Sequence, residues 1–179
     1  MEILLAVVLL IGSLIWGFKS MGNKTKNNAN PKIPEITKVN SIRDIVLAVN
    51  HGRIYPFYTR MNLIRAKNAA KTISPNALEI EQQLQFHEMI GIAPYFDIEV
   101  SNNYIERISV TLNKNGLVSS VGINIKNFES NTKSLLDEMV LKFGRPYSMD
   151  NEFVIWREGP MVINICRDGS LAVIDETIF

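Results

Sequence analysis

The chain has 179 residues, 46% of them hydrophobic, a formal net charge of +1 and one cysteine, Cys166. This length provides for one domain of ordinary size besides an apolar N-terminal segment. A single cysteine excludes an intramolecular disulfide framework. From residue 41 onward the net charge is −2, which argues against a nucleic-acid-binding protein because such proteins carry a basic footprint.

An uninterrupted run without charged residues spans positions 3–18. As a helix it would rise about 24 Å, against a bilayer hydrocarbon core of about 30 Å. Trp16 and Phe18 suit the membrane interface, and Lys19 can extend to the headgroups. The run predicts a single-pass transmembrane anchor over residues 1–19. A cleaved secretory signal and a buried core helix are the alternatives, although a secretory signal would need a basic start and small residues at its cleavage position.

The charges that flank the run predict its orientation. No Lys or Arg precedes it, whereas four lysines follow within residues 19–32. The positive-inside rule therefore favours a cytoplasmic domain on a bacterial inner membrane over a periplasmic or envelope-facing one, which stays open as the alternative. Ser13 and Gly17 form a small-xxx-small pair, which predicts at most a weak homodimer through the anchor.

Residues 20–40 are rich in Asn, Lys, Thr and Pro and show no hydrophobic period. This composition predicts a flexible basic linker with a span of about 26 Å, which would keep residues 41–179 near the bilayer as a single domain. The order of anchor, basic linker and compact α+β domain resembles the layout of bacterial single-pass tethering proteins that hold a partner at the inner membrane. The resemblance is one of layout and includes no shared motif.

Helical signals fill the first part of the domain. Ser41 followed by Asp44 predicts a helix start, and the apolar residues that follow share one face until Gly52. Residues 53–58 have the composition of an aromatic loop containing proline. Thr59 is expected to cap a second helix, and the Ser-Pro pair at residues 74–75 is expected to open a third helix that reaches about residue 90.

The hydrophobic period changes to two after Ala93, which predicts strands. They are expected at residues 96–100, 108–112, 121–125, 153–156, 161–166 and 171–174, with a hairpin turn at residues 115–116. A helix is expected from about Thr132 to Phe143, ended by Gly144. This order predicts an α+β domain in which helices are followed by a largely antiparallel sheet, with one further helix packed on it.

The sequence contains no recognisable catalytic motif. It has no G-x-S-x-G, P-loop or dinucleotide-binding pattern, and neither His51 nor His87 has a second ligand at metal-binding spacing. We therefore predict no cofactor and no metal. Asp97 and Glu99 share one strand face, where solvated carboxylates are also expected. Whether the protein is an enzyme stays open, since a small hydrolase using Asp97, Glu99 or His87 would require a pocket that unites them with a nucleophile.

The candidate interaction surface combines a basic stretch with the aromatic loop. Five cations lie within residues 53–71, and no acidic residue follows until Glu79. Such a surface would suit an anionic leaflet, at about 1 kcal/mol per cation, or a protein-binding hot spot. A solvated helix face and the rim of a core are the plain alternatives. The candidate residues are Arg53, Tyr55, Phe57, Tyr58, Arg60, Lys67 and Lys71.

The sequence as a whole predicts a membrane-anchored, non-catalytic module that tethers or regulates a protein partner at the membrane. The bilayer would be contacted through residues 3–18, and no nucleic acid is expected as a partner. Reversing the charges of Arg60, Lys67 and Lys71 is expected to weaken association and to leave folding intact.

Overall fold

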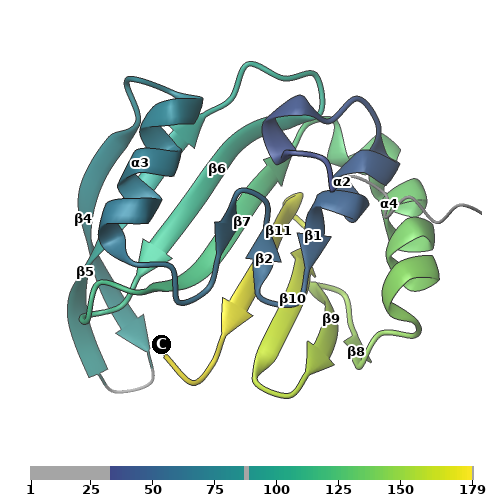
Figure 1. The fold of residues 1–179 in the computed structure, drawn as a ribbon. Coiled ribbons are helices and arrows are strands. Elements are labelled where there is room, and N and C mark those ends of the chain that lie inside the picture. Colours follow the sequence, from purple (N-terminus) through teal and green to yellow (C-terminus); the bar gives the residue numbers. More distant parts are fainter. Residues whose placement is uncertain (1–32, 87–88, 179) are drawn as a thin grey trace, which may run out of the picture. The chain divides into compact units, whose positions relative to one another are not determined.

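The computed structural model describes residues 33–86 and 89–178 (Figure 1), which belong to one compact unit, Ile33–Phe179. The predicted anchor and the first part of the linker lie outside the described residues. Within the described residues, no helix is long and apolar enough to cross a membrane. The compact unit begins before residue 41, because the 3₁₀ helix η1 (Ile36–Lys38) packs into it and both Ile36 and Val39 are buried.

An eight-stranded antiparallel sheet with the order β4-β5-β6-β7-β11-β10-β9-β8 forms the body of the domain. Its strands are β4 (Leu78–Phe86), β5 (Met89–Glu99), β6 (Ile105–Leu112), β7 (Val118–Ile125), β8 (Ser148–Met149), β9 (Phe153–Glu158), β10 (Met161–Cys166) and β11 (Ser170–Asp175). The predicted α+β class and antiparallel sheet are confirmed. All six predicted strands fall within β5, β6, β7, β9, β10 and β11 or overlap them.

Three α-helices and a small sheet form a second layer. The helices are α2 (Ile42–Ala48), α3 (Leu63–Ile73) and α4 (Phe128–Phe143), and the small sheet consists of β1 (Val49–Asn50), β2 (Arg53–Ile54) and β3 (Phe57–Tyr58). Figure 1 shows α3 near the β4–β5 end of the large sheet and α4 with β8 at the other end. The helix layer therefore presents two separate ends to its surroundings.

The predicted helix boundaries are partly confirmed. The Ser41 side chain accepts a hydrogen bond from the Asp44 backbone N–H and caps α2 as expected. Thr59 is buried and does not cap the second helix. Asn62 does so by accepting from the Arg65 N–H at 2.9 Å. The last helix begins at Phe128 rather than near Thr132, whose hydroxyl donates back to the Phe128 carbonyl within the first turn.

The predicted third helix, residues 74–90, is wrong. That stretch forms β4 and the start of β5, which pair from Leu78 opposite Asp97 to Phe86 opposite Met89. In the sequence, Leu78, Ile80, Leu84 and Phe86 occupy even positions, which is the period of a strand. The Ser-Pro pair at residues 74–75, which predicted a helix start, instead precedes β4. This strand pairs with β5, which lies farther along the chain.

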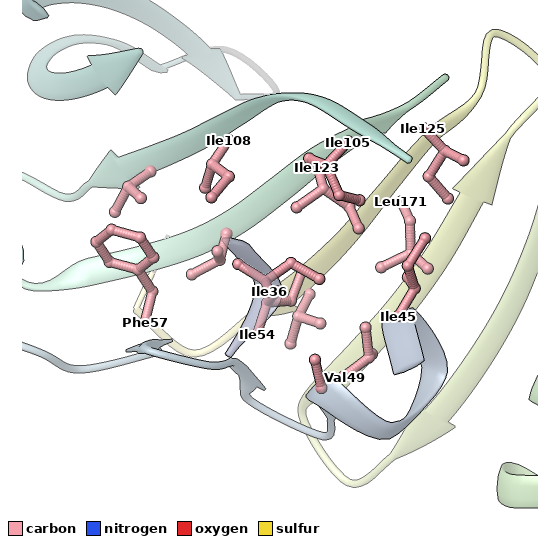
Figure 2. Close-up of a cluster of buried hydrophobic side chains, with 14 of the residues drawn as sticks. Ile36, Ile45, Val49, Ile54, Phe57, Ile105, Ile108, Ile123, Ile125 and Leu171 are labelled. Carbon is pink, nitrogen blue, oxygen red and sulfur yellow. The ribbon is translucent and has the colours of Figure 1, made fainter. Parts of the chain in front are cut away.

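The core lies between one face of the large sheet and the second layer. Figure 2 shows Ile108, Ile123 and Leu171 of the large sheet gathered with Ile45 of α2 and Phe57 of β3, and all five are fully buried. Burying such side chains stabilises the fold by about 1.5–3 kcal/mol each relative to exposure.

The other face of the large sheet is lined by smaller and more polar side chains. Ser109 on β6, Gly122 on β7 and Ala172 on β11 occupy successive positions across it. A Cβ atom at Gly122 would lie 2.6 Å from the Ser109 hydroxyl oxygen, so this row is closely packed. No helix within residues 33–86 and 89–178 packs on this face, which we call the open face.

Candidate interaction surfaces

The aromatic residues of the predicted surface do not form one exposed surface. Phe57 is 0% exposed and belongs to the core, so it cannot contact a partner, and its assignment to a surface is corrected. Tyr58 is half-buried against the core, and its hydroxyl accepts a hydrogen bond from Arg65 at 3.2 Å. Tyr55 is exposed. Residues 53–58 form β2 and β3 with a turn between them, which directs Phe57 inward.

Two of the predicted cations point to different parts of the molecule. The Arg60 Nε donates to the buried Asp175 carboxylate at 2.7 Å. Burial raises the pKa of Asp175, but hydrogen bonds from Arg60 and Thr177 outweigh burial and hold that pKa below its ordinary value. Arg53 lies instead toward α4. Burial lowers the pKa of Lys142 on α4, and the positive charge of Arg53 lowers it further.

The remaining cations belong to α3. Ala66 and Ala70 are its buried residues, and these small side chains let the helix lie close to the sheet. Arg65 and Lys71 are exposed, and Lys67 is half-buried. Ile64 stands beside them with 72% of its surface exposed. We define the basic face of α3 as Ile64, Arg65, Lys67 and Lys71.

A second surface, which the sequence analysis did not identify, lies where α4 ends and β8 begins. Eight large hydrophobic side chains are exposed among the described residues, and five of them lie within residues 140–153. We define these five as the apolar edge: Val140 (46% exposed), Leu141 (79%), Tyr147 (74%), Met149 (66%) and Phe153 (37%). Such a concentration is typical of a binding surface, because isolated exposed apolar residues are scattered over ordinary surfaces.

The apolar edge is held in place by specific contacts. The Trp156 indole N–H donates to the Gly144 carbonyl at 2.9 Å and fixes the end of α4 to β9. The Tyr147 N–H donates to the Ile155 carbonyl at 2.7 Å. The Arg157 guanidinium lies 5.6 Å from the centre of the Tyr147 ring. These contacts fix the backbone between α4 and β9 and the ring of Tyr147, which lowers the entropy cost of binding there.

Acidic side chains outnumber basic ones around the apolar edge. Residues 137–153 contain four acidic and two basic side chains, and Arg157 lies against Tyr147. One of the two bases, Lys142, donates to the Val46 carbonyl at 2.8 Å and to the Leu47 and Val49 carbonyls at the end of α2. Backbone hydrogen bonds from Glu152 and Phe153 lower the pKa of Asp150 and keep it ionised. The apolar edge therefore favours a partner with basic residues around an apolar centre.

The carboxylates considered for catalysis form a salt-bridge cluster on the open face. As predicted, Asp97 and Glu99 lie on one face of β5, and Arg107 of β6 is 3.1 Å from Asp97 and 4.0 Å from Glu99. Burial raises the pKa of the neighbouring Tyr95, and the charge of Asp97 raises it further. Ser109 lies opposite Asp97. Arg107 lies between the two carboxylates, and this geometry is that of an ion-pair cluster.

The structure describes one of the two histidines. His51 Nδ1 lies 2.7 Å from the Glu158 carboxylate, and its ring meets the Phe143 ring edge-on at 5.1 Å. His87 lies outside the described residues. Within the part of the chain that the structure describes, no three His, Cys, Asp or Glu side chains are placed to hold a metal ion.

An open hollow of about 790 Å³ lies at the start of α4. Lys126 and Arg167 line it together with Glu106, Glu129 and Asp168. The Lys126 ammonium already donates to the Asn102 carbonyl at 2.7 Å. Charges of both signs line the hollow, so they select no single class of ligand.

Three comparisons complete the description of these surfaces. No protein-family model matches the chain, and neither the curated proteins nor the solved structures give a significant match.

Proposed function

We propose that this protein is a non-catalytic interaction module that binds a protein partner through the apolar edge and is held at a membrane by residues 3–18. The partner would be recruited or regulated at the membrane surface. The observation that carries this proposal is the gathering of five exposed hydrophobic side chains at one end of the domain.

The composition of the apolar edge supports contact with protein. Tyr and Met are enriched in protein interfaces, and Tyr147 and Arg157, which lie against each other, are of residue types enriched among hot spots. The acidic surroundings disfavour the anionic inner leaflet, which attracts Lys and Arg instead. A protein with an apolar centre and a basic rim is the partner that this surface fits.

The test is site-specific photo-crosslinking of the full chain in its own cells. A photoreactive phenylalanine analogue at Leu141 should give one discrete crosslinked species of higher mass. The same analogue at Asn124, an exposed position on the open face, is the matched control and should give none. Absence of a crosslink at Leu141, or equal crosslinking at Asn124, would contradict the proposal.

We further propose that the domain faces the cytoplasm of a bacterial cell, with residues 3–18 as the single membrane span. The four lysines after this run support this orientation. A reporter that is active on only one side of the membrane, fused after Phe179, tests the proposal. Activity outside the cytoplasm would reverse the orientation and favour an envelope-facing partner.

A further inference from the structure

The two surfaces of the domain have complementary chemistry. The basic face of α3 presents the exposed Ile64 among Arg65, Lys67 and Lys71, and no acidic residue occurs between residues 45 and 78. The apolar edge includes Leu141 and Met149, and the exposed Asp137 and Glu152 lie near them in the sequence. One surface is apolar with basic neighbours, and the other is apolar with acidic neighbours.

The two surfaces also lie too far apart to meet within one domain. α3 packs on β5, near one edge of the large sheet, whereas β8 is the outermost strand at the other edge (Figure 1). An acidic apolar surface and a basic apolar surface at opposite ends cannot satisfy each other within one copy. They can do so between copies that are arranged head to tail.

We propose that the apolar edge of one copy binds the basic face of α3 on a second copy of this chain. The proposal rests on the proposed function and names its partner. The contact is heterologous, so each copy can bind a neighbour at each end, and a row of copies forms rather than a closed dimer. Attachment of all copies to one membrane raises their effective concentration, so a contact that is weak in solution suffices.

Cysteine crosslinking in native membranes tests this arrangement. All variants carry Cys166→Ser, which removes the natural thiol, and a short bismaleimide joins introduced cysteines. A chain with both Ile64→Cys and Leu141→Cys should give a ladder of dimers and larger oligomers. Chains with only Ile64→Cys or only Leu141→Cys should give no dimer alone but a dimer when co-expressed. Asn124→Cys is the control and should remain monomeric.

Charge reversal tests the complementarity itself. In the double-cysteine chain, Arg65→Glu with Lys71→Glu should lower the crosslinking yield about tenfold, since each surface ion pair contributes modestly. Adding Asp137→Lys and Glu152→Lys to the same chain should restore it. If the first two reversals lowered the yield by unfolding the domain, two further substitutions would not restore it. Recovery would therefore show that the yield depends on charge complementarity.

The other outcomes separate this inference from the proposed function. Dimers from Leu141→Cys alone would overturn the head-to-tail contact in favour of a symmetric one. Photo-crosslinking at Leu141 to a different protein, without a cysteine ladder, would overturn the self-association and leave the proposed function standing. No crosslink of either kind would overturn both.

Discussion

The helices at the two ends of the helix layer, α3 and α4, bury side chains of different size. At one end, α3 buries only Ala66 and Ala70 and directs polar and basic residues outward. At the other end, α4 buries the larger Leu135 and Met139, yet its last turn also exposes Leu141. In both helices the buried residues account for the packing on the core. The exposed Ile64 of α3 and Leu141 of α4 contribute little to folding, and both belong to the proposed contact between copies.

Shortening a buried residue of α4 should have the largest effect on stability. Met139 is fully buried in the main core, and Met139→Ala should lower the free energy of unfolding by about 2–5 kcal/mol. Leu141→Ala, two residues later on the same helix, should change it by less than about 0.5 kcal/mol. Urea unfolding of the full chain in detergent measures both, and similar losses would contradict the division between core and apolar edge.

Removing Arg60, the cation that faces Asp175, should have the second largest effect on stability. Arg60→Met leaves the Asp175 carboxylate buried without its charged partner, and we expect a loss of about 1–3 kcal/mol at pH 7, moderated because Arg60 itself is exposed. The folded-state pKa of Asp175 is lowered, so the pair stabilises the fold above the unfolded pKa of about 3.9. The difference between wild type and variant should shrink as the pH falls through the folded-state pKa. A difference independent of pH would show that the ion pair is not its cause.

Loss of the contact between Lys142 and α2 should lower the free energy of unfolding by a smaller amount. Lys142→Met removes a donor from the last carbonyls of α2 while keeping much of the side-chain volume, and a loss of about 1–2 kcal/mol is expected. Hydrogen exchange should quicken selectively in α2. Lys133→Met, an exposed position on the same helix, is the control and should change neither quantity.

Charge reversal on the basic face of α3 should have the smallest effect on folding. Arg65→Glu and Lys71→Glu should each change the free energy of unfolding by less than about 0.5 kcal/mol, since both side chains are exposed. Arg60 differs from these two residues, because its partner is the buried Asp175 carboxylate. The expectation that reversing the charge of Arg60 leaves folding intact is therefore withdrawn. A large loss from Lys71→Glu, measured by thermal unfolding, would assign the basic face to folding instead.

Local chemistry made much of the fold predictable. The cap formed by Ser41, the turn before Gly116 and the alternating strands are specified by residues near one another in the sequence. β4 was missed because a strand depends on its partner, and that partner lies farther along the chain. A check for alternation at Leu78 and Ile80 would have indicated it.

The candidate surfaces were harder to predict, because exposure depends on packing between distant elements. Phe57 lies within the aromatic stretch of residues 53–58, yet it is fully buried in the core. Val140 follows Leu136 by one helical turn, yet almost half of it is exposed. Leu141 is 79% exposed, and no pattern used in the sequence analysis indicated a surface at the end of this helix.

The most direct test of the account is the accessibility of the apolar edge in place. Leu141→Cys in a Cys166→Ser chain should react with a membrane-impermeant maleimide reagent at least about tenfold more slowly in opened native membranes than after purification in detergent. Asn124→Cys should react equally in both. This result would show that the apolar edge is occupied in its native setting. Equal rates at position 141 in membranes and in detergent would contradict the account.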